Sequence, residues 1–221
     1  MNLPEPRYPL YVFDFDGTLA DTRRAVVATY GETLAALGLP LADPARITSL
    51  MGLPLGTTFE HVGVPAARVG EAVLEYRRRF ETVGTPLVTL FAGVTDTLRH
   101  LRAQGSRLTV ASSRGRSSLR ALLSHLQIAE LFDVVVGEED VVRKKPEPEA
   151  VLHILRTVGA TANEALVVGD TVYDLEMGRS AGCATCGVTY GSHPTAQLAP
   201  LVTHPSYLIG RFDALLGLPA R

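Results

Sequence analysis

The sequence predicts an α/β fold in which a parallel sheet carries helices on both faces and a helical segment is inserted after the first strand. Three observations support this. Short apolar runs rich in β-formers recur along the chain, helical patterns separate most of them, and the stretch 20–86 shows helical periodicity with no convincing strand. Strands that alternate with helices of this length are typical of a parallel sheet covered on both faces.

The strands are expected where the short apolar runs occur. The first run, 11–13, ends abruptly at Asp14, and the others are 107–111, 134–136, 165–168, 185–188 and a possible last strand at 207–209. Between them, leucines at i, i+3 and i+4 spacing predict helices, as in the stretch 119–126. The connections between parallel strands are expected to be right-handed. The core is therefore expected to be a Rossmann-like, doubly wound parallel sheet.

The stretch 20–86 breaks this rhythm and is expected to form an inserted α-helical cap domain. One amphipathic stripe is closed by Gly38 and a second by Gly84, and the segment between them is rich in Gly and Pro. The expected domains are an α/β core at 1–19 and 87–221 and a cap at 20–86. Such an insert lies over the carboxyl ends of the strands, where open α/β sheets bind ligands.

The composition argues against a nucleic-acid-binding or membrane-spanning protein. The formal net charge is -2, and the 21 basic and 23 acidic side chains are spread along the chain. A nucleic-acid partner is not expected, because such binders usually carry a basic stripe. No run approaches the ~20 apolar residues that a membrane span needs, and no secretory signal is recognised. Cys183 and Cys186 are interpreted as buried thiols, which favours a reducing cytoplasm. A monomer or homodimer acting on a small metabolite is expected.

The strongest chemical signal follows the first strand, in Asp14-Phe15-Asp16-Gly17-Thr18-Leu19. Two carboxylates two residues apart at a strand end share a face. Repulsion between like charges raises one pKa, so one group can be protonated while the other is anionic. That pair can supply a nucleophile and a general acid. Gly17 permits a sharp exit from the strand. The alternative is a polar turn, where Asp and Gly are common.

A second cluster, Ser112-Ser113, follows the strand expected at 107–111. A hydroxyl and neighbouring backbone N–H groups at a strand end can hold a phosphate oxygen, although a serine there is often a simple helix cap. A third cluster places Lys145 directly before Pro146. A lysine facing clustered carboxylates would neutralise charge and orient a phosphoryl group. Alternatively, Lys-Pro is an extended entry into the next helix.

A fourth cluster holds Asp170, at the end of the strand expected at 165–168, and Asp174, one turn into the following helix. Carboxylate oxygens of this kind are the ligands that Mg²⁺ prefers. Asp174 has an alternative interpretation as an acid at a helix N-terminus. Four aspartates and one lysine would leave a charge of -3 at the site, which a divalent cation must offset before a phosphate dianion can approach.

The four clusters, in this order, resemble the motifs of the haloacid dehalogenase-like hydrolases, on their phosphatase branch. The resemblance implies that Asp14 attacks phosphorus and Asp16 protonates the leaving oxygen and later activates water. It implies phosphate binding by Gly17, Ser112, the amide of Ser113, and Lys145. It also implies an Mg²⁺ site made by Asp14, the backbone carbonyl of Asp16 and Asp170, with Asp174 in support.

Other short matches resemble the phosphoglycolate phosphatase and pyrophosphatase-like group, among them the turn around Gly52. Gly52 could bring the cap backbone close to a ligand or could simply shape a loop. The cations available for a substrate carboxylate or a second phosphate are Arg23, Arg24, Arg46 and Arg114. We expect Mg²⁺-dependent hydrolysis of a small, phosphoglycolate-like phosphomonoester. The alternatives are a pyrophosphatase, a sugar-phosphate phosphatase or mutase, and an inactive interaction protein that retains the fold.

Overall fold

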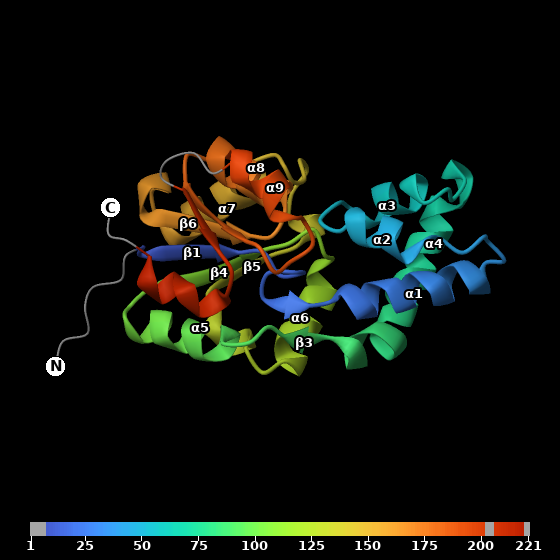
Figure 1. The fold of residues 1–221 in the computed structure, drawn as a ribbon, viewed down its shortest axis with the longest axis horizontal. Coiled ribbons are helices and arrows are strands. Elements are labelled where there is room, and N and C mark those ends of the chain that lie inside the picture. Colours follow the sequence, from blue (N-terminus) through green and yellow to red (C-terminus); the bar gives the residue numbers. More distant parts are fainter. Residues whose placement is uncertain (1–7, 202–205, 219–221) are drawn as a thin grey trace.

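The computed structural model describes residues 8–201 and 206–218. Its main sheet has six parallel strands among these residues, in the order β5-β4-β1-β6-β7-β8. Four of them, β1, β4, β5 and β6, are labelled in Figure 1. The strands are β1 (Leu10–Phe13), β4 (Arg107–Ala111), β5 (Val134–Val136), β6 (Ala165–Gly169), β7 (Ala184–Val188) and β8 (Ser206–Ile209). The sequence prediction of a parallel α/β sheet is confirmed.

Successive side chains of the central strand β1 point to opposite faces of the sheet, and all of them are apolar, which explains why helices cover both faces. Leu10 and Val12 pack into one apolar cluster with residues of α7 (Glu149–Val158) and α8 (Val172–Ser180). Tyr11 and Phe13 pack into the other, against α5 (Val94–Ala103), α6 (Arg116–His125) and the 3₁₀ turn Phe212–Gly217. All four strand residues are buried, as expected for a central parallel strand.

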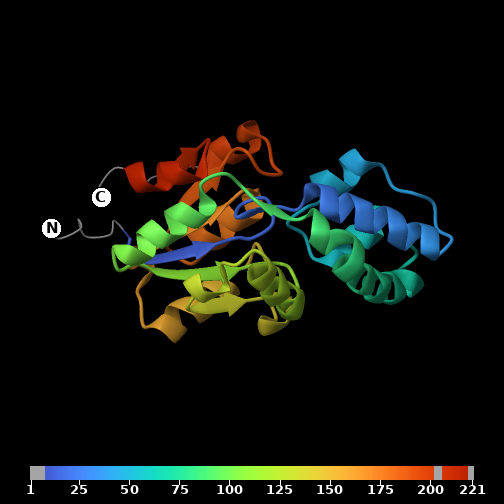
Figure 2. The same cartoon turned by 90° about the horizontal axis from the view of Figure 1, so that it is seen from below.

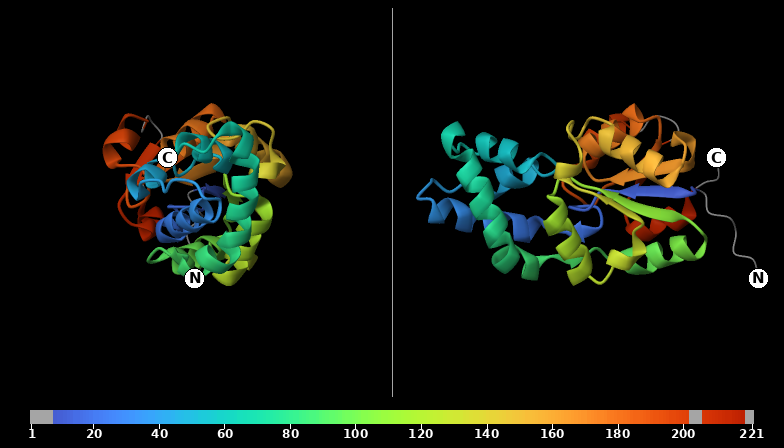
Figure 3. Two further views of the ribbon diagram at one scale, coloured as in Figure 1. Left: turned by 90° about the vertical axis from the view of Figure 1, so that its right-hand side faces the viewer. Right: turned by 180° about the vertical axis from the view of Figure 1, so that it is seen from behind.

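Helices α1 to α4 form a separate group beyond the end of β1, on the right in Figure 1 and again apart from the sheet in Figure 2. They are α1 (Arg23–Ala36), α2 (Pro44–Ser49), α3 (Leu55–His61) and α4 (Ala66–Arg79). Aromatic rings fill the space between them: the centroid of Tyr30 lies 4.7 Å from that of Phe59 and 4.9 Å from that of Tyr76. The right-hand view in Figure 3 shows the same two-part arrangement. The helical cap expected from the sequence is therefore present.

Three details of this helical insert differ from the expectation. Two short strands, β2 (Ala20–Asp21) and β3 (Thr89–Leu90), pair antiparallel where the chain leaves and re-enters the core. The Gly- and Pro-rich segment contains α2 and α3. The second long helix ends at Arg79 and continues as the wider π-helical turn Phe80–Gly84. The domain bounds at 20 and 86 stay a prediction.

Two further expectations concern individual residues and helix lengths. Cys183 and Cys186 are buried, and they pack into the clusters on opposite faces of the sheet. Within residues 8–201 and 206–218, no helix has both the length and the apolar character that crossing a bilayer requires. The position predicted for the last strand, 207–209, lies within β8.

Candidate active site

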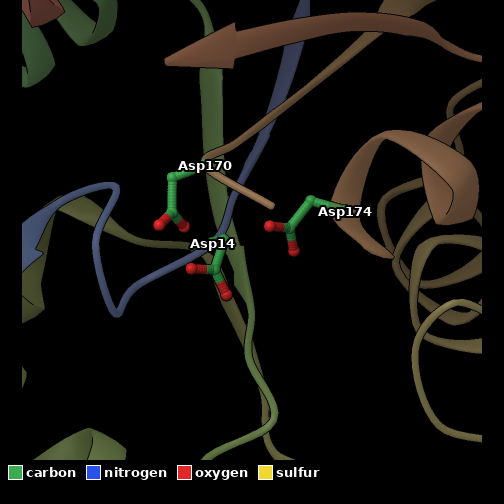
Figure 4. A group of neighbouring side chains, drawn as sticks. All are labelled: Asp14, Asp170 and Asp174. Carbon is green, nitrogen blue, oxygen red and sulfur yellow. The ribbon is translucent and has the colours of Figure 1, made fainter. Parts of the chain in front are cut away.

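Three buried aspartates meet at the carboxyl edge of the sheet. Asp14 directly follows β1, Asp170 directly follows β6, and Asp174 lies in the first turn of α8. Figure 4 shows their carboxylates turned toward a shared space. One oxygen from each lies within 4.8 Å of the others. Neighbouring parallel strands end at one edge of the sheet, so the fold brings together residues that are far apart in the sequence.

Lys145 joins two of these carboxylates. Its Nζ donates hydrogen bonds to Asp14 Oδ1 and Asp174 Oδ1, both at 2.6 Å, and its side chain is 5% exposed. The second oxygen of Asp174, Oδ2, accepts bonds from the N–H and the hydroxyl of Thr171, which caps α8. Asp174 therefore acts as a helix-cap partner and as an anchor for Lys145 at once.

Asp170 is fixed by two loops that approach it closely. Its Oδ1 accepts a bond from the Thr18 hydroxyl at 3.2 Å, and its Oδ2 accepts one from the Ser192 N–H at 2.6 Å. A Cβ added to Gly17 would lie 2.2 Å from Asp170 Oδ2, and one added to Gly191 would lie 2.2 Å from Asp170 Cβ. Glycine is needed at both positions because only a bare backbone fits against this carboxylate.

The crowding of carboxylates perturbs their titration in a way that fits a bound cation. Burial is the main cause that raises the pKa of Asp14 well above its usual value, and repulsion from Asp174 and Asp170 adds to it, against the attraction of Lys145. Burial, then repulsion from Asp174, raises the pKa of Asp170 to about 7. A divalent cation would reverse both shifts because it stabilises the charged forms. Buried carboxylate oxygens suit Mg²⁺.

Asp16 has a different partner. Its two carboxylate oxygens accept bonds from Arg114 Nη2 at 2.6 Å and Nε at 3.1 Å, in a fork. Burial raises the pKa of Asp16, but the charge and hydrogen bonds of Arg114 outweigh it, so the pKa lies below its usual value. Asp16 is therefore anionic in this conformation, and the Arg114 contact has to change before Asp16 can carry a proton. Arg114, which the sequence offers as a cation available to a substrate, is thus engaged by Asp16.

The two serines after β4 lie beside the aspartates. Ser112 is buried, and its Oγ accepts a bond from the Arg114 N–H at 3.2 Å. The hydroxyl of Ser113 donates to the carbonyl of Gly52 at 2.9 Å. Gly52 has a φ of +96°, and a Cβ there would lie 3.0 Å from Thr171 Cγ2. The cap backbone thus touches the core at Gly52, whose role toward a ligand stays a prediction.

A cavity of about 540 Å³ lies between the helical insert and the core. Asp14, Asp16, Ser112, Ser113 and Gly52 are among its lining residues. Sequence reasoning missed two features of its wall. The guanidinium of Arg114 stacks 4.3 Å from the ring centroid of Phe80, and Arg77 pairs with Glu138 at 3.0 Å. No sequence spacing signals either contact, because the partners come from different elements.

Together, the doubly wound sheet, the helical cap and the aspartate cluster define a capped α/β protein with an acidic centre at the carboxyl edge of its sheet. The family model described as haloacid dehalogenase-like hydrolase matches residues 11–188, and the chain belongs to this family. The resemblance inferred from the sequence motifs is confirmed.

Curated relatives and solved structures agree with this assignment. The "Probable phosphatase IndB" of Dickeya dadantii is 36% identical, over 95% of this chain and 92% of the relative. A phosphoglycolate phosphatase of Pectobacterium atrosepticum is 32% identical, over 93% and 90% of the two chains. A haloacid dehalogenase-like family hydrolase from Streptococcus pneumoniae has a TM-score of 0.85 at 25% identity, covering 96% of this chain and 98% of its own.

Proposed function

We propose that this protein is an Mg²⁺-dependent phosphatase that hydrolyses phosphomonoesters through a phosphoryl group carried on Asp14. The observation that carries the proposal is the contact of Lys145 with both Asp14 and Asp174, beside Asp170, at the carboxyl edge of the sheet. A nucleophile, a cation and a set of metal ligands then lie within one small volume. The names of the relatives and the family match support the same class of reaction.

We assign a separate role to each residue of the site. Asp14 Oδ1 is held by Lys145, and no other described residue donates a hydrogen bond to Asp14 Oδ2, so Oδ2 is the oxygen we assign to attack on phosphorus. Asp14, Asp170 and the backbone carbonyl of Asp16 would hold Mg²⁺, with Asp174 in support through Lys145. When bound, Mg²⁺ offsets the carboxylate charge that would otherwise repel a phosphate dianion.

Asp16 is assigned to proton transfer. It would protonate the leaving oxygen and afterwards take a proton from the water that hydrolyses the aspartyl phosphate. Gly17, Ser112 and the amide of Ser113 are assigned to the phosphate oxygens. Because Arg114 holds Asp16 as an anion in this conformation, substrate binding has to loosen the Arg114 contact first.

Phosphoglycolate is the substrate that the sequence resemblance suggests, and it serves as a reference compound in the tests. The location in the cytoplasm, the monomeric or homodimeric state and the absence of a nucleic-acid partner stay predictions. An inactive interaction protein is disfavoured because each of the four chemical clusters has its side chains in place.

The test is the release of inorganic phosphate from a small aryl phosphate, with and without Mg²⁺. Asp14→Asn should abolish release, and chelating Mg²⁺ should abolish it in the wild type. Asp96→Asn is the matched control, because Asp96 is exposed in the first turn of α5, away from the site. Release that persists in Asp14→Asn would remove Asp14 as the nucleophile.

A further inference from the structure

The wall that the helical insert contributes to the cavity is mainly apolar. Its lining residues include Tyr30, Ile47, Leu53, Leu55, Tyr76 and Phe80, which come from all four helices of the insert and the segments that follow them. This wall faces the catalytic residues Asp14 and Asp16 across the same cavity. The alcohol portion of a bound phosphate ester would therefore lie against aromatic and aliphatic side chains.

The charged side chains that line the cavity offer few favourable contacts to an anionic leaving group. Arg77 and Arg114 are the cations among the described residues that line it. Arg114 is held in a fork by Asp16, and Arg77 is paired with Glu138 and lies 3.8 Å from Glu139. Glu138, Glu139 and Glu81 add negative charge to the lining. The lining therefore has more carboxylates than guanidinium groups, and it stays negative even when Arg114 is released from Asp16, so placing a carboxylate or second phosphate here is unfavourable.

Three of the four arginines that the sequence offers as cations for an acidic substrate lie outside the lining of the cavity. Arg23, Arg24 and Arg46 are exposed, and none of them is among the lining residues. Arg23 donates instead to the carbonyl of Gly191 at 2.9 Å. Lys145 is bound by Asp14 and Asp174. The three arginines of the insert that the sequence offers as candidate cations for a second acidic group therefore lie outside the lining of this cavity.

The size of the cavity also favours a bulky apolar alcohol portion over a small acidic one. A cavity of about 150 Å³ is enough to bind benzene, and this one measures about 540 Å³. A phosphoryl group with a two-carbon acid would leave much of the apolar wall in contact with water. A phosphoryl group with a ring-bearing alcohol would cover that wall, and each buried apolar group strengthens binding.

We propose that this cavity selects phosphomonoesters whose alcohol portion is uncharged and carries a ring or an apolar group of similar bulk. The proposal rests on the phosphatase function above, and it names the class of substrate. It places substrate choice on the apolar wall of the insert, whereas the phosphoryl chemistry belongs to the core.

The test compares alkyl phosphates whose leaving groups have similar intrinsic reactivity. Phosphate release in Mg²⁺ is measured for 2-phenylethyl phosphate, ethyl phosphate and phosphoglycolate. We expect kcat/KM for 2-phenylethyl phosphate to exceed each of the other values by at least about 10-fold, the effect of burying one ring. Phosphoglycolate turned over as fast or faster would overturn the substrate class and leave the phosphatase function standing. No release from any ester would overturn both.

Two leucine variants test whether the apolar wall determines the substrate selectivity. Leu53 is half-buried and lines the cavity, whereas Leu74 is 70% exposed on α4 and does not. Leu53→Arg should lower the ratio of kcat/KM for 2-phenylethyl phosphate over phosphoglycolate by at least about 10-fold, because it adds a cation and removes apolar surface. Leu74→Arg should leave the ratio unchanged.

Each ratio is measured within one variant, so a partly unfolded fraction cancels from the comparison. Thermal melting of both variants verifies that they fold. An unchanged ratio in a folded Leu53→Arg protein would contradict the assignment of substrate choice to this wall.

Discussion

The ammonium group of Lys145 lies between two buried carboxylates. The charge balance of the site depends on this residue. It donates to Asp14 and Asp174 at 2.6 Å. Burial lowers the pKa of Lys145, but the two carboxylates outweigh this and raise it above its usual value. Lys145 is therefore charged throughout the physiological pH range, and its hydrogen bond orients Asp14.

Replacing this lysine should show how much that ion pair contributes. Lys145→Met should lower kcat/KM for a phosphomonoester by about 100-fold or more, which is typical for the loss of one group that stabilises transition-state charge. Lys144→Met is the control, because Lys144 is more exposed and pairs with Glu138. Steady-state kinetics in Mg²⁺ would measure both. A decrease of less than about threefold in Lys145→Met would contradict the role assigned to Lys145.

The positions of Asp14 and Asp170 could be predicted because each directly follows a strand, and strand ends of a parallel sheet converge. Lys145 lies well beyond the end of β5, so it was placed with them by the resemblance of its Lys-Pro motif, and the structure brings the three together. The pairing of Asp16 with Arg114 could not be predicted. It depends on how the backbone turns after β1 and β4, and the sequence carries no periodic signal for such a turn.

At the scale of elements, the loops that follow β1 and β7 hold Asp170 by close backbone approach. Gly191 has no room for a side chain, since a Cβ would lie 2.2 Å from Asp170 Cβ. Gly210, after β8, would have Thr189 Oγ1 as its nearest neighbour at 3.8 Å. The two glycines are therefore a matched pair, one at the site and one away from it.

Gly191→Ala should displace Asp170 and disturb the metal site. We expect a loss of about 1 to 3 kcal/mol in the free energy of unfolding, together with a higher Mg²⁺ requirement for activity. Gly210→Ala should change the free energy of unfolding by less than about 0.5 kcal/mol. Chemical denaturation and Mg²⁺ titrations of activity measure the two effects. Equal stability and equal Mg²⁺ requirement in the two variants would contradict the packing argument.

Asp133 ties α5 and β4 together at the start of β5, through Arg102 at 3.0 Å and Arg107 at 3.4 Å. Partial burial raises its pKa, but these two arginines outweigh it, so the pKa lies below its usual value. A depressed carboxyl pKa contributes stability above the unfolded-state pKa, and the contribution is lost as the pH falls through the folded-state pKa.

Asp133→Asn should therefore reduce the free energy of unfolding at pH 7 by less than about 1 kcal/mol, because the pair is partly exposed. The difference from wild type should shrink as the pH falls below about 4, where the unfolded-state carboxyl titrates. Denaturation curves at a series of pH values would show this. A difference that grows toward low pH would contradict the sign of the effect.

Element prediction succeeded where periodicity is strong. The main strands and the long helices were recovered from apolar spacing, whereas the two-residue strands β2 and β3 were missed. Their pairing joins residues 20–21 to residues 89–90, and two residues are too few to show an alternating pattern. The helices α2 and α3 were missed because six or seven residues carry little periodicity.

At the scale of the whole molecule, the helical insert and the core enclose the site between them. The described contacts across this boundary include Ser113 to Gly52, Arg77 to Glu138 and Arg23 to Gly191, as well as the Arg114 guanidinium over Phe80. Such contacts are individually weak in water.

Metal binding should stabilise the folded chain as a whole, because the ligands come together only on folding. At Mg²⁺ concentrations about 100-fold above the Kd, the gain is about 2.7 kcal/mol, which corresponds to a Tm increase of about 5 to 10 °C for a chain of this size. Differential scanning calorimetry with Mg²⁺ and with a chelator measures it. Asp170→Asn should lose the increase, and Asp96→Asn should keep it. No increase in the wild type would contradict the metal site.

The central claim is that the phosphoryl group passes through Asp14. The direct measurement mixes wild-type protein and Mg²⁺ with an excess of radiolabelled phosphate ester, quenches the reaction in acid within milliseconds, and maps the label by peptide fragmentation. We predict label on Asp14 that precedes the release of free phosphate, and no labelled protein with Asp14→Asn. Label on another residue, or rapid phosphate release by Asp14→Asn, would contradict the mechanism.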